Sequence, residues 1–250
     1  MSHYSVSFKC GSLLIAFLLL CGCAGYRIGG VKFDKAANTH IKKIELLRID
    51  EPNIKIYGAS KWYSNPLLFG GGIVGSFLSY YTTGVPTEKK QSGVFLKAKD
   101  ENFVFFGPLM AKAIQQELTK IGYDVTYLDN ILPKEKIGKK DVQTDADAFL
   151  FLSWNAGYDW SDKQKCFRPN VSASITLYES RERRCIYCRG IAVMEPHNGT
   201  EIGDFLIEML PDEQYKYSSL DELMQNFDEA AQGIIDCLNK IAVCLAEELK

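Results

Sequence analysis

Two long amphipathic segments, separated by short apolar ones, predict an α/β fold of the α+β type. In residues 106–121 and again in residues 220–249, apolar side chains recur at the three- and four-residue spacing of one helix face. The segments around them show the unbroken or alternating apolar pattern of strands. We therefore expect a mixed sheet with a long helix after the first strand and a C-terminal helix packed on it.

The first half of the domain should hold two strands and a helix. Residues 41–49 predict a strand, and Ile54 with Ile56 indicates a short second strand after a polar turn. In the helix that follows, Pro108 suits the first turn and Gly122 suits the end.

The second half should hold the rest of the sheet. Residues 125–128 predict a strand, and the nearly continuous apolar run 148–154 is typical of a strand covered on both faces. Residues 171–178 and 185–194 predict a hairpin across a charged turn. Hydrophobic residues make up 46% of the chain and charged residues 24%, so a globular core can form.

The N-terminus has the pattern of an export signal. The apolar run 13–20 follows Lys9 and is shorter than the roughly 20 residues that span a bilayer. It leads into Leu20-Cys21-Gly22-Cys23, which resembles the lipobox of bacterial lipoproteins. Cys23 fits better than Cys21, because the small Gly22 precedes it. The alternative is an ordinary buried hydrophobic segment with incidental cysteines.

The lipobox resemblance implies both a cellular location and a membrane anchor. Acyl chains such as palmitate on Cys23 would hold the mature chain on a membrane of the bacterial cell envelope, facing the periplasm. Ala24, in place of an aspartate, favours the outer membrane. We expect a signal peptide at 1–22, a tether at 23–40 and one domain at 41–250, with a glycine-rich apolar insertion at about 50–104. The 29 basic and 31 acidic residues leave no basic excess for a nucleic acid partner.

The insertion contains the most unusual stretch, residues 65–81. It is apolar, aromatic and rich in glycine, and it predicts either a buried hairpin or an exposed patch for a membrane or a partner. Its GxGxxG spacing resembles a dinucleotide turn, but Pro66 shortens any preceding strand, and we predict no cofactor. The residues of the possible patch are Leu67, Leu68, Phe69, Ile73, Val74, Phe77 and Leu78.

Five cysteines remain after the leader and the anchor: Cys166, Cys185, Cys188, Cys237 and Cys244. Cys185 and Cys188 form a CxxC motif on a predicted strand, where residues three apart point to opposite faces, so the two thiols should not meet. A zinc site would need further cysteines or histidines nearby, and we predict no metal site and no catalytic residue.

An aromatic cluster follows the apolar strand 148–154. Trp154, Tyr158 and Trp160 either line a ligand groove or pack against the end of the sheet. His40 and His197 belong to no metal or triad pattern, and we expect both in loops.

The order of elements is similar to that of the TolB-N-terminal-like and curli-assembly-type envelope lipoproteins. The matching residues are 43–47 for the first strand, 118–125 for the helix exit, 145–150 for the central strand and 174–178 for the hairpin. The insertion is a departure from this pattern. The resemblance implies binding or assembly in the envelope, with a protein partner or with further copies of the chain, and it offers no catalytic residues.

Two other functions stay open. The chain could be an oligomeric subunit that inserts residues 66–81 into a membrane, or a thiol-dependent or hydrolytic enzyme. The absence of a nucleophile–base spacing argues against the enzyme.

Overall fold

The computed structural model describes residues 30–57, 95, 97, 99–100, 104–130, 144–195 and 205–250. The expected signal peptide, Cys23 and the apolar stretch 65–81 lie outside this part of the chain. No helix within the described ranges is long and apolar enough to cross a membrane.

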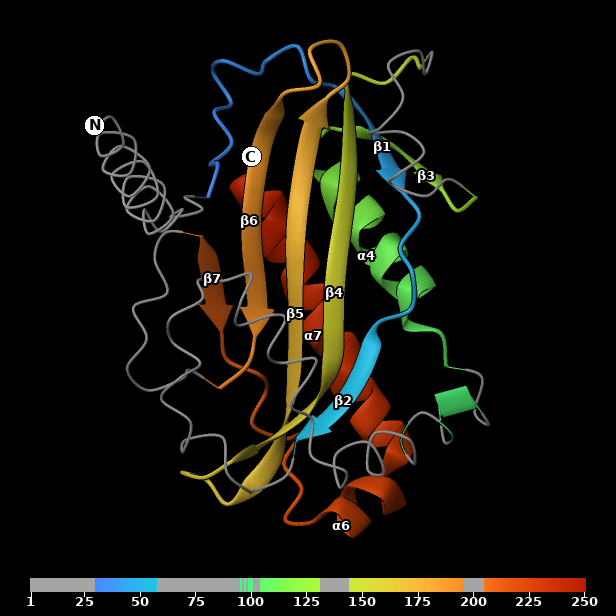
Figure 1. The fold of residues 1–250 in the computed structure, drawn as a ribbon, viewed down its shortest axis with the longest axis vertical. Helices are drawn as coiled ribbons and strands as arrows, with labels where there is room; N and C mark the ends of the chain where they lie inside the picture. Colours follow the sequence, from blue (N-terminus) through green and yellow to red (C-terminus); the bar gives the residue numbers. More distant parts are fainter. Residues whose placement is uncertain are drawn as a thin grey trace, which may run out of the picture. The chain divides into compact units, whose positions relative to one another are not determined.

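The fold is the predicted α+β arrangement around one mixed sheet (Figure 1). In the described residues, strands pair in the order β3-β1-β4-β5-β6-β7, and β2 also pairs with β4. The strands are β1 (Lys43–Leu47), β2 (Asn53–Tyr57), β3 (Asp124–Leu128), β4 (Ala148–Ser161), β5 (Cys166–Glu179), β6 (Cys185–Val193) and β7 (Leu206–Met209).

β4 is the strand on which the two halves of the sheet meet. It is antiparallel to β5, and its other edge is parallel to β1 along residues 148–150 and to β2 along residues 155–159. Gly157 permits the second of these pairings, because a Cβ atom there would lie 1.6 Å from the carbonyl oxygen of Lys55. Both ends of the sheet are edge strands, β3 and β7.

β4 and β5 are each 14 residues long, which corrects the shorter strands expected at 148–154 and 171–178. The continuous apolar run ends at Trp154, but the helix-facing side of β4 goes on through Ala156 and Tyr158. The sequence of the strand therefore changes at Trp154 from continuously apolar to alternating, and the strand itself continues beyond this residue.

The long helix after the first strand, α4 (Phe106–Lys120), has the predicted limits within a residue. Phe105 at its start provides no side-chain cap. Instead Glu51 accepts hydrogen bonds from the amides of Gly107 (2.9 Å) and Phe106 (3.3 Å). A carboxylate at this position satisfies free amides and favours the positive end of the helix dipole.

The C-terminal helix is divided, where a single helix was expected at 220–249. α6 (Leu220–Gln225) ends at Asn226, whose φ of −107° and ψ of 42° are not helical, and α7 (Phe227–Glu248) follows. Ser219 caps α6 by accepting from the Glu222 amide.

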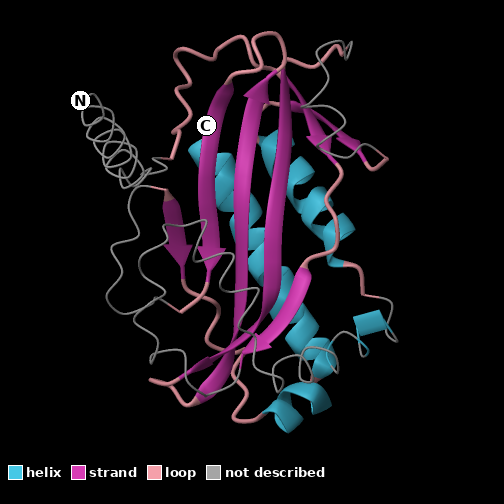
Figure 2. Ribbon diagram, viewed as in Figure 1, coloured by secondary structure: helices cyan, strands magenta, loops and turns pink. Residues whose placement is uncertain are grey.

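α4 and α7 cover the same face of the sheet and also pack against each other (Figure 2). Their apolar stripes lie on the inward-facing side chains of β1, β4, β5 and β6 and form one core with them. The opposite face of the sheet is the one turned toward the viewer in Figure 1.

Two further segments contact the core of the domain. Val31 forms a two-bond bridge with Cys188, and Asn38 is buried, so these two residues of the expected tether contact the domain. From the expected insertion, β2 joins the sheet and Phe95 is fully buried against Phe227.

Candidate functional site

Most of the site residues predicted from the sequence lie beyond the described ranges. Cys23 lies there, and so do the patch residues Leu67, Leu68, Phe69, Ile73, Val74, Phe77 and Leu78. The structure places only the three aromatic residues of the possible groove, Trp154, Tyr158 and Trp160.

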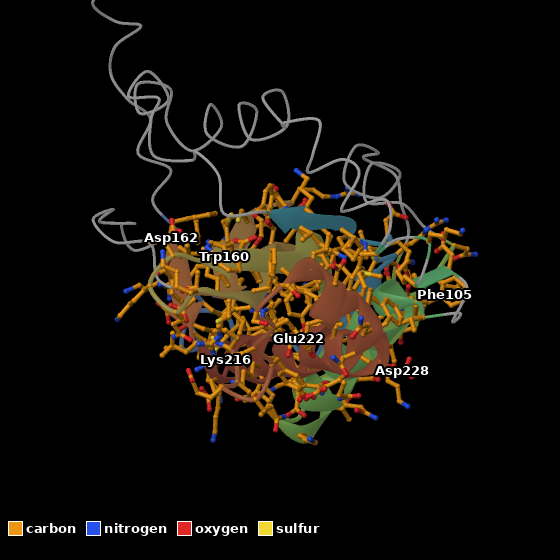
Figure 3. The ribbon with its side chains drawn as sticks, turned by 90° about the horizontal axis from the view of Figure 1, so that it is seen from below. Phe105, Trp160, Asp162, Lys216, Glu222 and Asp228 are labelled. Atoms are coloured by element: carbon orange, nitrogen blue, oxygen red, sulfur yellow. The ribbon has the colours of Figure 1, made fainter. Side chains whose placement is uncertain are left out.

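These three residues lie within β4, on its helix-covered side, and not beyond its end. Trp154 is 7% exposed and donates its indole N–H to the Asp50 carbonyl at 3.0 Å. Tyr158 is fully buried and donates to the Ala230 carbonyl of α7 at 2.9 Å. Trp160, at the end of the sheet seen in Figure 3, packs edge-on against Phe167. Trp154 and Tyr158 thus donate their polar hydrogens to main-chain carbonyls, and Trp160 makes an aromatic contact.

An open apolar groove lies instead between β7 and α7. It has a volume of about 460 Å³. Ile207 and Met209 supply its wall on β7, and Val243, which is 42% exposed, supplies the facing wall on α7. Asn239, Lys240, Cys244 and Glu247 complete the lining. We call this set of seven residues the β7–α7 groove.

The backbone of β7 offers hydrogen-bonding groups beside this groove. The Gly190 amide donates to the Phe205 carbonyl at 2.8 Å, and the Met194 amide donates to the Met209 carbonyl at 2.9 Å. Alternate residues of a strand direct their main-chain N–H and C=O groups to the same neighbour. The main-chain groups of Ile207 therefore point toward β6, whereas those of Leu206 and Glu208 point away from the sheet. Among the described residues, no group bonds to these outward amides and carbonyls.

Charged groups form the rim at one end of the groove. Lys240 donates to the Leu210 carbonyl at 3.1 Å and to Asp212 at 2.6 Å. Burial raises the pKa of the Cys244 thiol to about 11, with Glu248 and Glu247 adding to the shift. Leu210, just after β7, is 57% exposed and extends the apolar surface. The groove therefore presents an apolar floor with a polar margin, which is typical of protein-binding surfaces.

A buried arginine holds the chain that follows β7. Arg168 is 1% exposed and donates to the Pro211 carbonyl at 2.8 Å. It also pairs with Glu195 at 2.8 Å and Glu213 at 2.9 Å. Hydrogen bonds from Lys216 and Arg168 lower the pKa of Glu213. This network joins β5 to the segment that directly follows β7, and it thereby helps to fix the position of β7.

Neither the groove nor Arg168 was foreseen from the sequence. A short apolar segment, residues 206–210, is the pattern that could have predicted an edge strand here. Its closeness to Val243 is a tertiary feature, since the two lie more than thirty residues apart in the chain.

The opposite edge of the sheet carries a polar hollow of about 720 Å³. Lys43, Glu45, Asp124 and Thr126 line it from β1 and β3, together with residues 144–146. Its polar lining makes it a poor surface for an apolar partner.

The two thiols of the CxxC motif lie on one face of the sheet, which corrects the sequence-based expectation. Cys188 is paired with Thr176 and Cys185 with Tyr178, across a β-bulge that inserts one extra residue into β6. Thr176 and Tyr178 are two apart on β5 and therefore share a face, and so do their cross-strand partners. Because Ile186 is the extra residue of the bulge, Cys185 and Cys188 lie on the same face although they are three residues apart.

The thiols have little nucleophilic character. Burial raises the pKa of Cys166, of Cys185 and, to about 12, of Cys237. A reactive cysteine needs a lowered pKa. Within the described residues, no group of three or more histidine, cysteine or acidic side chains could hold a metal ion. His40 lies in a turn and contacts Glu179 at 2.8 Å, whereas His197 lies outside the described ranges.

Comparisons with known proteins do not assign a family. No protein-family model matches the sequence, and no curated protein matches it either. Among solved structures, protein XCC0632 from Xanthomonas campestris, of the DUF330 family, is 9% identical with a TM-score of 0.36, over 82% of this chain and 81% of that one.

Two further bacterial structures show a similar level of likeness. A protein described as a neuraminyllactose-binding hemagglutinin homolog from Helicobacter pylori is 14% identical with a TM-score of 0.33, over 90% of this chain and 89% of that one. Lipoprotein GNA1162 from Neisseria meningitidis is 13% identical with a TM-score of 0.27, over 64% of this chain and 88% of that one. All three TM-scores are below 0.5.

Proposed function

We propose that this chain is a lipid-anchored protein of the bacterial envelope that binds a protein partner and catalyses no reaction. The location rests on the export signal and on Leu20-Cys21-Gly22-Cys23, which together predict a lipid on Cys23. Ala24 supports the outer membrane as the membrane that carries the anchor, with the domain facing the periplasm.

The observation that carries the binding role is the open edge of β7 beside the β7–α7 groove. An extended peptide can add to such an edge through main-chain hydrogen bonds, while alternate side chains of the peptide enter the groove. Leu206 and Glu208 would supply the main-chain groups. Ile207, Met209 and Val243 would take the apolar side chains. The occupant we propose is an extended segment of an envelope protein.

The raised pKa values support binding over thiol catalysis. At neutral pH the thiols of Cys166, Cys185, Cys237 and Cys244 stay protonated and are poor nucleophiles.

The anchor is tested by comparing the wild type with Cys23→Ala. We expect the wild type in the membrane fraction with the mass of attached acyl chains, and the variant without that added mass. A soluble, unmodified wild type would remove the envelope from the proposal.

The binding surface is tested by placing a photo-crosslinking amino acid at Val243 in cells. Leu109, which is 36% exposed on α4, is the matched control position. We expect a discrete adduct with a second protein from position 243 and not from position 109. Equal adducts from the two positions would contradict a role for the groove, and an adduct of twice the chain mass would identify a second copy as the occupant instead.

A further inference from the structure

The bulge in β6 makes a two-thiol site on the sheet face opposite the helices. Cys185 and Cys188 are both half-buried, and they are the cross-strand partners of Tyr178 and Thr176, which lie on one face of β5. Thr176 donates from its hydroxyl to the sulfur of Cys188 at 3.7 Å. Cys185 donates to the Tyr187 carbonyl at 3.4 Å.

We propose that Cys185 and Cys188 together bind one soft monovalent metal ion, Cu(I), as a pair of thiolates. This inference does not depend on the partner-binding role proposed above. It concerns a different face of the sheet and different residues.

The separation of the two positions is compatible with a bridging ion. Their partners Thr176 and Tyr178 are two residues apart on β5, which is about 6.6 Å along a strand. A disulfide joins Cα atoms that are usually about 4.4–6.8 Å apart, and it needs the two sulfurs about 2.05 Å apart. Two metal–thiolate bonds of about 2.3 Å each, the length found for zinc, let the sulfurs stay up to about 4.6 Å apart.

The number and kind of ligands favour Cu(I). Structural zinc sites take four ligands, and within the described residues no third histidine, cysteine or acidic side chain joins the pair. Thiolates are soft ligands and select Cu(I) over hard cations. Binding breaks two S–H bonds, forms two Cu–S bonds and releases two protons to the solvent, with no change in oxidation state.

The test is a competition between the full-length protein and a coloured Cu(I)-specific chelator, with reduced protein and no oxygen. We expect the wild type to withhold one more Cu(I) ion per chain than Cys185→Ser, Cys188→Ser or the double variant. The affinity at this site should fall at least about 100-fold in each single variant, because even the loss of outer partners costs about 10–100-fold. Thr176→Val, which removes the hydroxyl that contacts Cys188, should lower it about tenfold.

Cys166→Ser and Cys237→Ser are the matched controls, since both thiols lie elsewhere in the fold. We expect them to withhold as much Cu(I) as the wild type. The proposal is overturned if either CxxC variant matches the wild type, or if the controls lose the same amount.

A second readout needs only the wild type. Cu(I) should protect Cys185 and Cys188 together from alkylation, measured by peptide mass spectrometry, and equal alkylation with and without Cu(I) would overturn the proposal.

Discussion

The two edge strands of the sheet, β3 and β7, differ in how far described side chains cover them. At the β3 edge, Gln115 on α4 reaches over and donates to the outward carbonyl of Val125 at 2.8 Å. The polar hollow lined by Lys43, Glu45 and Asp124 lies beside it. At the β7 edge, no described group takes up the outward main chain, and the adjoining groove is apolar.

This difference indicates which edge is built to pair. Proteins commonly block edge strands with charges and covering side chains, because bare edges join to other strands. Among the described residues, such protection is present at β3 and not at β7. An edge of this kind beside an apolar groove is suited to a specific partner strand.

The largest effect on stability should come from Arg168, which holds the segment that follows β7. Arg168→Met removes the buried donor to Pro211, Glu195 and Glu213. We expect the free energy of unfolding, measured with urea, to fall by about 3 kcal/mol, since breaking a buried ion pair costs about 3–5 kcal/mol and one of its partners is exposed here.

The matched control is Arg184→Met. Arg184 is half-exposed and pairs with Glu179 at 3.2 Å. A surface pair of this kind contributes less than about 1 kcal/mol. Equal losses in the two variants would show that the Arg168 network has no special role in holding the β7 edge.

A smaller effect is expected when the protection of β3 is removed. Gln115→Leu leaves the Val125 carbonyl without its side-chain donor, so the stability should fall by about 1 kcal/mol. The uncovered edge should also increase self-association, measured by sedimentation over a range of protein concentrations. Gln232→Leu removes an exposed glutamine that donates to Asp236 at 2.8 Å, and it should leave the protein monodisperse.

The smallest effect concerns Asp147, near the β3 edge. Burial tends to raise the pKa of Asp147, but hydrogen bonds from the Lys43 and Lys42 amides and the charges of His40 and Arg181 lower it overall. A lowered pKa stabilises the fold above the ordinary carboxyl value of 3.8, and this stability is lost as the pH falls further.

Asp147→Asn should therefore lower the free energy of unfolding by up to about 1 kcal/mol at pH 7, and by less below about pH 4. Urea unfolding at the two pH values measures both. Asp145→Asn, which changes a neighbouring exposed carboxylate, is the matched control. A difference for Asp147→Asn that grows in acid would contradict the assigned direction.

The main elements of the fold follow from the sequence because their patterns are local. The apolar stripe of α4 and the alternation in β5 and β6 each reflect one face of one element. The break at Asn226 was missed because the apolar spacing continues across it. The length of β4 was missed because its pattern changes partway along the strand.

The candidate sites could not be predicted in the same way. The extra residue Ile186 brings Cys185 and Cys188 to the same face of the sheet, and no residue pattern marks such a bulge. The β7–α7 groove depends on a four-residue strand that lies beside a helix distant in the chain. Both sites result from pairing between elements and not from the spacing within one element.

The most direct test of the open edge is Glu208→Pro, with the photo-crosslinker at Val243. Proline removes an amide that faces away from β6, so the sheet keeps its own hydrogen bonds and only an added strand loses one. We predict that the adduct falls at least about tenfold, since a lost hydrogen bond contributes about 1.4 kcal/mol, with an unchanged melting temperature. Glu208→Ala, which keeps the amide, should retain the adduct. An unchanged adduct in a folded Glu208→Pro protein would contradict strand addition at β7.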